Sequence, residues 1–333
     1  MPLVPTGASD GREVPAALIS EGVLSPVRRD PLTGDPVLLA PARDARPHDV
    51  GRPSTGAGCP FCEGNEAATP PETQAVRPRG GAPDTPGWLV RAIPNKFPAV
   101  GQDEGVHEVI VNTPRHVVRL QDLTDDEAGL AGRVWAERIA AVEMDPRGLW
   151  PFLFLNQGAA AGASLQHTHV QLVGLPLEPP RLLALERAFE ETRRCPVCAD
   201  IEGAAAAGRV VDEDMGLVAW SPEVPPLTGT LRVGPARHAA DWTAPPGPGA
   251  AARFLRRQAA AAGERLGAEA LNAWLHRARR GLGGRYHWHM DLIPRLGTLA
   301  GLELGTGVIA VAISPTELAG RLRGAPAAAQ SGA

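Results

Sequence analysis

Two stretches of the chain carry the same residues in the same order, and this repeat limits the folds that the chain can adopt. In each stretch a Cys-X-X-Cys pair is followed by an Arg-His pair and then by a His-X-His triplet. The cysteine pairs begin at residues 59 and 195 and the triplets at 167 and 287, so the period is about 120 to 136 residues. A period of this length is typical of a repeated domain rather than of a short solenoid unit. The sequence therefore predicts two related domains in tandem.

Local patterns predict both strands and a long helix in each half. The apolar run 150–155 predicts a buried strand, residues 108–112 predict another, and the alternation of 167–173 predicts a third. Thr124 and Glu127 form a capping box ahead of the apolar stripe of a helix over 124–144, whose residues are Leu130, Val134, Ile139 and Val142. Residues 250–266 are its counterpart in the second half.

A hairpin is expected over residues 25–46, with its turn at 31–35 and with Leu38 and Leu39 in the returning strand. The expected fold class is therefore α+β, with two tandem domains of antiparallel sheet and packed helices that arose by internal duplication. The predicted divisions are a disordered N-terminus (1–22), an N-terminal domain (23–185), a C-terminal domain (186–323) and a disordered tail (324–333).

Composition narrows the class of protein. The 333 residues include 21% charged residues and carry a formal net charge of −4, which gives no support for a nucleic-acid or membrane partner. No run approaches the ~18 apolar residues that a spanning helix needs. Because the first residues also lack the pattern of a secretory signal, we expect a cytoplasmic protein.

The four cysteines are the strongest chemical signal after the repeat. A structural disulfide is not expected in the cytoplasm, and a thioredoxin-type redox motif has no reason to occur twice. Two thiolates and two imidazoles make a closed tetrahedral zinc site, and each cysteine pair is followed by two histidines. We therefore expect two structural zinc sites per chain, formed by Cys59, Cys62, His116 and His167 and by Cys195, Cys198, His238 and His287.

The segment 156–176 carries the pattern expected of a phosphate-handling site. A loop of small residues with accessible backbone N–H groups precedes the first triplet. In an extended chain, residues two apart share a face, so His167, His169 and Gln171 are expected to point the same way. A neutral imidazole whose second nitrogen is held by an acceptor is a good nucleophile near neutral pH. His169 and Gln171 are the predicted catalytic residues, although the competing interpretations of His169 are a third metal ligand and a buried structural histidine.

The Cys-X-X-Cys pair, the later histidine and the segment NxGAxxGxSxxHxHxQ together resemble the galactose-1-phosphate uridylyltransferase family of the histidine-triad superfamily. Because both halves carry a Cys-X-X-Cys pair and a His-X-His triplet, the chain is most similar to the two-zinc branch of this family, which is related to plant ADP-glucose phosphorylase. The resemblance implies a homodimer and ping-pong transfer through a nucleotidyl-histidine, with His169 as nucleophile. It further implies nucleotide or phosphate contacts from Arg43, Arg46, Asn95, Asn156, Gly162 and Ser164.

The second half departs from this pattern. Asp291 replaces Gln171, His276 replaces Asn156, and residues 277–285 replace the small-residue loop. A carboxylate repels phosphate, so His289 is expected to belong to a scaffold rather than to a second active site. A second metal held by His276 and His289 with Glu186 is the alternative to the second cysteine set. His48 and His107 are given no role.

The expected function is nucleotidyl transfer, first of all from UDP-glucose to galactose 1-phosphate. The alternatives are an ADP-glucose or dinucleoside polyphosphate phosphorylase, a histidine-triad hydrolase, and a zinc-stabilised nucleotide-binding protein without transfer activity. Thr168 stands where the uridylyltransferases have proline, and residues 302–314 lack their late glutamine. These two departures leave open the base of the donor nucleotide and the identity of the acceptor. The expected partners are nucleotide sugars and sugar phosphates.

Overall fold

The computed structural model describes residues 27–45, 58–278 and 283–324, and the chain divides into two compact units, 1–39 and 40–333. The first unit contains the hairpin of β1 (Val27–Arg29) and β2 (Pro36–Leu38), in which Val27 pairs with Leu38. The Asp30 carboxylate accepts the Leu32 N–H at 2.7 Å and so stabilises the turn. The predicted hairpin is confirmed, although its second strand ends at Leu38 rather than Leu39.

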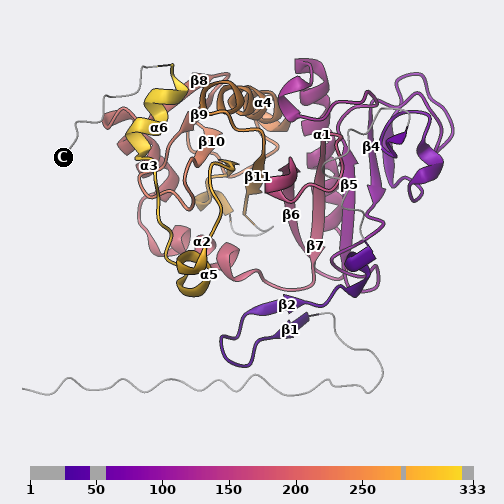
Figure 1. Cartoon of the computed structure of the whole chain (residues 1–333), viewed down its shortest axis with the longest axis horizontal. Helices are drawn as coiled ribbons and strands as arrows, with labels where there is room; N and C mark the ends of the chain where they lie inside the picture. The colour runs from indigo at the N-terminus through magenta and orange to yellow at the C-terminus, as the bar shows by residue number, and fades with distance from the viewer. Residues whose placement is uncertain (1–26, 46–57, 279–282, 325–333) are drawn as a thin grey trace, which may run out of the picture. The chain divides into compact units, whose positions relative to one another are not determined.

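Ten strands of the second unit form one antiparallel sheet (Figure 1). Its order is β3-β4-β5-β7-β6-β11-β12-β10-β9-β8. The first five in this order are β3 (Gln74–Val76), β4 (Val90–Pro94), β5 (Val106–Val111), β7 (His169–Leu175) and β6 (Trp150–Gln157). The other five are β11 (Leu271–His276), β12 (His289–Pro294), β10 (Leu231–Pro235), β9 (Leu217–Trp220) and β8 (Val210–Asp214).

The strand order is the same read from either edge, with each strand of one half matched by its repeat in the other. The two central strands, β6 and β11, are such a matched pair, and they hydrogen-bond to each other with Asn272 opposite Asn156. The α+β duplication is therefore confirmed, but the two halves share one continuous sheet instead of forming separate sheets. The boundary at residue 185 stays a prediction.

Helices α1 (Asp125–Glu143) and α4 (Gly247–Leu266) lie side by side over one face of the sheet (Figure 1). Thr124 caps α1, and its capping box with Glu127 is present as predicted. The helices approach closely because glycine lies between them. A Cβ atom at Gly132 would lie 2.3 Å from the Pro248 carbonyl oxygen and 2.7 Å from the Ala252 Cβ.

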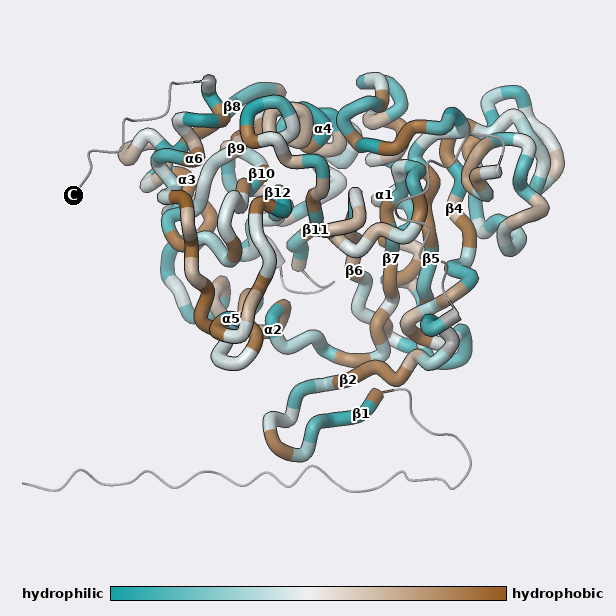
Figure 2. Tube along the Cα trace, in the orientation of Figure 1, coloured by the Kyte–Doolittle hydropathy of each residue, from teal (hydrophilic) through white to brown (hydrophobic). Residues whose placement is uncertain are grey.

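The alternation of the strands separates two faces with different contents. On the helix side, Val170 and Leu172 of β7 join Leu153, Leu155 and residues of α1 and α4 in the main core. Figure 2 shows apolar residues concentrated along β4, β5 and β7. The opposite face has two smaller apolar clusters, one over β4 and β5 and one over β9, while His169 and Gln171 face that side between them.

The remaining helices belong mostly to the second half. They are α2 (Pro180–Glu191), α3 (Pro196–Ala206), α5 (Gly301–Thr306) and α6 (Pro315–Leu322). Phe189 of α2 and Val197 of α3 pack with Trp220 of β9. Among the described residues, no helix combines the length and apolar character needed to cross a bilayer. The disorder predicted for 1–22 and 324–333 concerns residues outside the described ranges, apart from Gly324.

The capping box makes a testable contribution to stability. Burial alone would raise the pKa of Glu127, but hydrogen bonds from Arg115, the Thr124 N–H and the Thr113 hydroxyl outweigh it and lower the pKa to about 2. Because the folded-state pKa lies below the unfolded one, this stabilisation is complete above pH ~4.5 and is lost as pH falls through about 2. We expect Glu127→Gln to lower the free energy of unfolding by about 1 kcal/mol at pH 7.

Urea unfolding of both proteins at pH 8, 6, 5 and 4 measures this difference. It should be constant from pH 8 to 5 and begin to shrink only below pH ~4.5. Asp126→Asn is the matched control, since Asp126 lies in the same first turn but outside the capping box. A difference that already shrinks between pH 8 and 6 would contradict this assignment.

Candidate active site and metal centres

The first cysteine pair meets two histidines from distant parts of the chain. Cys59 Sγ lies 3.5 Å from Nδ1 of His167, and Cys62 Sγ lies 3.3 Å from Nδ1 of His116 and 3.7 Å from that of His167. All four ligand atoms lie within 4.8 Å of one another. His167 Nε2–H donates to the Thr113 carbonyl at 2.9 Å, so its Nδ1 lone pair faces the cysteines. The four side chains therefore form a Cys2His2 cluster.

The second pair forms an equivalent cluster. Cys195 Sγ lies 3.7 Å from Nδ1 of His287, and Cys198 Sγ lies 3.7 Å from Nδ1 of His238 and 3.4 Å from that of His287. His287 Nε2–H donates to the Pro235 carbonyl at 3.0 Å, which repeats the arrangement of His167. The main difference is exposure, because His238 is exposed while His116 is half-buried.

Both clusters fit zinc. Zn–S bonds of about 2.3 Å and Zn–N bonds of about 2.0–2.1 Å place tetrahedral ligand atoms about 3.3–3.8 Å apart, which matches the distances above. Burial and the adjacent Cys59 raise the pKa of Cys62 to about 12, and burial and Cys195 raise that of Cys198 to about 11. The positive charge of a bound divalent cation would stabilise the deprotonated, thiolate form of both cysteines in each pair. Its contribution in these closed sites would be structural.

His169 follows directly on the first cluster, as the first residue of β7. Its Nδ1–H donates to the backbone carbonyl of His167 at 2.7 Å, so Nε2 is the nitrogen that carries the lone pair. The ring is buried and packs edge-on against Phe61, with 5.2 Å between ring centroids. His167 itself precedes the strand and belongs to the metal cluster, whereas His169 and Gln171 line a common pocket.

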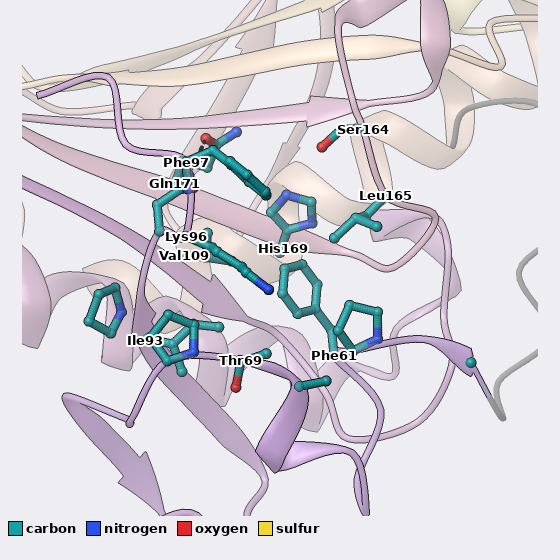
Figure 3. A pocket seen from close by; sticks show the side chains of 16 residues that line it. Phe61, Thr69, Ile93, Lys96, Phe97, Val109, Ser164, Leu165, His169 and Gln171 are labelled. Carbon is teal, nitrogen blue, oxygen red and sulfur yellow. Dashed lines mark hydrogen bonds between the residues drawn. The ribbon is translucent and has the colours of Figure 1, made fainter. Parts of the chain in front are cut away.

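This pocket is a cavity of about 330 Å³ beside β4, β5 and β7 (Figure 3). Its walls are largely apolar and include Phe61, Ile93, Val109 and Leu165. Polar groups gather at one side, where His169, Gln171 and Ser164 lie (Figure 3). An apolar compartment next to a few polar groups suits a nucleoside attached to a phosphate.

The residues expected to contact substrate do not all lie in this pocket. Asn95 and Ser164 line this pocket, whereas Asn156 lines a neighbouring cavity beside the small-residue loop. Gly162 has φ +79° and ends the single turn 159–161 of that loop, a backbone conformation that favours glycine. Arg43 donates to the Phe97 carbonyl at 3.1 Å, at the edge of the pocket. Arg46 lies outside the described residues.

Lys96 was missed by the sequence analysis. It is the one Lys or Arg among the described residues that line the pocket, and Figure 3 shows its side chain reaching toward His169 and Phe61. Its ammonium group could neutralise a bound phosphate. The only available signal was its position beside Asn95 in the segment PNKF.

Asn272 is a contribution from the second half that no motif predicted. Its Nδ2 donates to Oδ1 of Asn156 at 2.8 Å and to the Ala161 carbonyl at 3.0 Å. The Asn156 oxygen is thereby occupied, which leaves its amide N–H groups for a ligand. The loop and Asn156 are therefore held by a residue of β11, across the junction between the two halves.

The corresponding region of the second half is filled by charged side chains. Asp291 takes the position of Gln171, and Arg232, its register partner, takes that of the pocket residue Val109. Arg232 Nε donates to Asp291 at 3.2 Å, and His276 Nε2 lies 2.9 Å from the same carboxylate. Burial would raise the pKa of Asp291, but His276 and Arg232 hold it well below its ordinary value. Asp291 is therefore an anion where a phosphate would have to bind.

His276, His289 and Asp291 lie close enough to share a metal ion, but their atoms already contact one another and their neighbours. Trp274 Nε1 lies 2.8 Å from His276 Nε2, and Arg232 forms an ion pair with Asp291 at 3.2 Å. His289 Nδ1–H donates to the His287 carbonyl at 3.1 Å, as in the first half. Glu186 is not part of this group, so the cysteine set is the better second metal site.

Comparison with known proteins agrees with this description. Residues 91–179 match the family model described as the N-terminal domain of galactose-1-phosphate uridyl transferase. ADP-glucose phosphorylase of Arabidopsis thaliana is 27% identical over 95% of this chain and 96% of its own length. Galactose-1-phosphate uridylyltransferase of Streptomyces lividans is 32% identical, but over 50% of this chain and 42% of its own length.

Among solved structures, that of the Arabidopsis thaliana ADP-glucose phosphorylase with bound ADP-glucose matches 90% of this chain and 99% of its own. The TM-score is 0.70 at 26% identity. The duplicated sheet with its His-X-His strands is that of a nucleotidyltransferase of the histidine-triad superfamily. Within that class, residues 91–179 resemble the galactose-1-phosphate uridylyltransferase family, and most of the chain is similar to the plant ADP-glucose phosphorylase.

The metal content of the purified protein tests both clusters. We expect about two zinc ions per chain by elemental analysis. The double change Cys59→Ser and Cys62→Ser should lower the content to about one and destabilise the fold, because zinc binding to such a cluster is coupled to folding. His169→Ala is the control on the adjacent strand and should keep both ions. A content of one in the unmodified protein would show that one cluster does not hold zinc.

Proposed function

We propose that the protein transfers a nucleotidyl group through a covalent intermediate on His169, with ADP-glucose as donor and phosphate as acceptor. The observation that carries this proposal is the tautomer of His169. Its Nδ1–H is held by the His167 carbonyl, and its side chain lines the pocket, so Nε2 is the nucleophilic nitrogen. The apolar walls take the nucleoside, and the polar side of the pocket takes the phosphates.

The reaction has two displacements. Nε2 attacks the α-phosphorus of the donor, a P–N bond forms, and the bond to the bridging oxygen breaks to release glucose 1-phosphate. The imidazole keeps its Nδ1 proton, and the His167 carbonyl stabilises the resulting positive charge. An oxygen of the acceptor phosphate then attacks the same phosphorus, the P–N bond breaks, and ADP leaves with neutral His169 restored.

The groups around His169 supply positioning and charge neutralisation, which dominate catalysis of phosphoryl transfer. The Gln171 amide, the Ser164 hydroxyl and the Lys96 ammonium all line the pocket. Asn156 and Gly162 belong to the adjoining strand and loop. The first metal cluster would hold His167, and with it the start of β7, in place without touching the substrate.

The choice of donor rests on the extent of the similarity. The plant ADP-glucose phosphorylase matches nearly the whole chain, whereas the uridylyltransferase of Streptomyces lividans matches half of it. Thr168 also favours ADP-glucose over UDP-glucose as donor, because it departs from the uridylyltransferase pattern. Its N–H donates to the Val117 carbonyl at 2.6 Å, a bond that the proline of the uridylyltransferases cannot make. We therefore propose ADP-glucose ahead of UDP-glucose, which is the reverse of the order expected from sequence.

Uridylyl transfer from UDP-glucose to galactose 1-phosphate is the second candidate, supported by the family model over residues 91–179. The homodimer and the cytoplasmic location stay predictions.

Intact-protein mass after mixing with one donor and no acceptor tests the mechanism and the base together. We expect an adenylyl adduct from ADP-glucose that is absent in His169→Ala, because the P–N bond requires Nε2. Retention of two zinc ions by the variant is the control for folding. A uridylyl adduct alone would select the second candidate, and no adduct from either donor would favour a hydrolase or a binding protein.

The adduct should reach one nucleotidyl group per chain and no more. His289→Ala is expected to leave this stoichiometry unchanged, because Asp291 and Arg232 fill the equivalent region of the second half. Quantitative mass spectrometry of His169→Ala and of His289→Ala measures the number of nucleotidyl groups per chain. Two groups per chain, or a lower yield per folded chain in His289→Ala, would contradict a scaffold role for the second half.

A further inference from the structure

His107 is a buried histidine of β5 that lies outside both metal clusters and outside the cavity lining. Its Nδ1 accepts the backbone N–H of Ala99 at 2.8 Å. A backbone N–H can only donate, so Nδ1 carries the lone pair and the proton of the neutral ring lies on Nε2. The contact with Ala99 therefore determines the tautomer of His107.

The protonated nitrogen of His107 points at the side chain of Gln171. Nε2–H donates to Gln171 Oε1 at 3.1 Å, and Asn95 Nδ2 approaches the same oxygen at 3.4 Å. The Asn95 amide is itself oriented, because its Oδ1 accepts the Phe97 N–H at 2.9 Å. The two donor nitrogens lie 3.1 Å apart as they converge on one acceptor. Both lone-pair directions of Oε1 are thus used by protein donors, of which His107 lies outside the cavity lining and Asn95 lies within it.

We infer that His107 is a positioning residue that orients the Gln171 amide so that its N–H2 group, and not its oxygen, faces the phosphate of the substrate. An amide can rotate by half a turn at little cost in shape, and the rotated form would present Oε1 to an anion. The rotated form is disfavoured because its NH2 group would face two other donors. This inference rests on the proposed function of the site, where it assigns the hydrogen-bond donor for the transferred phosphoryl group.

The two ring nitrogens of His107 can be mimicked separately. Asparagine places a polar atom near the position of Nδ1, so His107→Asn can still accept the Ala99 N–H but cannot reach Gln171. Glutamine places its amide near the position of Nε2, so His107→Gln can still donate to Gln171 but releases Ala99. If His107 only anchors the loop that contains Ala99, asparagine is the better replacement. If it orients Gln171, glutamine is the better replacement.

Single-turnover formation of the nucleotidyl-enzyme from ADP-glucose or UDP-glucose separates these roles. We expect His107→Asn to lower the maximal rate by about 10- to 100-fold with little change in the donor concentration at half-maximum, because the lost donor acts on the transition state. His107→Gln should keep most of the rate. Equal losses in the two variants, or a greater loss in His107→Gln, would overturn the inference.

Two further measurements keep the inference separate from folding and from the proposed function. In a Gln171→Ala background, His107→Asn should cause no additional loss, whereas a purely structural role predicts losses that add. The tautomer of His107 is read from the nitrogen-15 shifts of labelled wild-type protein, with His107→Gln assigning its signals among the nine histidines. An Nδ1–H tautomer would overturn the inference whatever the reaction. Absence of any adduct in wild type, with the Nε2–H tautomer present, would count against the proposed function alone.

Discussion

The hydrogen bonding between β6 and β11 is the interaction on which the rest of the structure depends. It joins two copies of a five-strand unit at equivalent strands, so that neither copy has a free edge at the centre of the sheet. The same pairing lets α1 and α4 pack against each other over one face, where Gly132 allows their close approach. It also brings Asn272 of the second half beside Asn156 of the first. The site in the first half is therefore completed by the second.

The two halves keep the same backbone but differ in the chemistry of a few side chains. In the first half, Val109 leaves room beside Gln171 for a ligand, whereas Arg232 occupies the matching position beside Asp291. The pseudo-symmetry also fails at the central strands, because the position matching Asn272 is Phe152, whose side chain has no hydrogen-bond donor. A buried ion pair in one half thus corresponds to a binding cavity in the other. Duplication thus supplies one continuous sheet, on which only the first half keeps a cavity beside its His-X-His motif.

At and beside the pocket, three polar side chains are oriented by neighbours that do not line it. The His167 carbonyl determines the tautomer of His169, His107 acts on Gln171, and Asn272 acts on Asn156. Groups held in this way need little reorganisation when charge develops on a phosphate. The first Cys2His2 cluster contributes to the same end, because His167 belongs to the cluster and its carbonyl is the acceptor for His169.

Much of this could be predicted from the sequence, because motifs of Cys, His and small residues at a repeated spacing have few structural explanations. The duplication, the mixed α and β class, both Cys2His2 sets and the capped helix at Thr124 were all available from local patterns. The merging of two sheets into one was not, because strand pairing between halves leaves no signature in either strand alone. His107, Lys96 and Asn272 were missed for a related reason: a lone polar residue in a strand takes its meaning from the side chains it meets. The sequence by itself thus determined the repeat, the two Cys2His2 sets and the His-X-His motif. Tertiary structure decided which neighbours orient the amides and which half keeps a cavity, because those features depend on contacts between residues far apart in the chain.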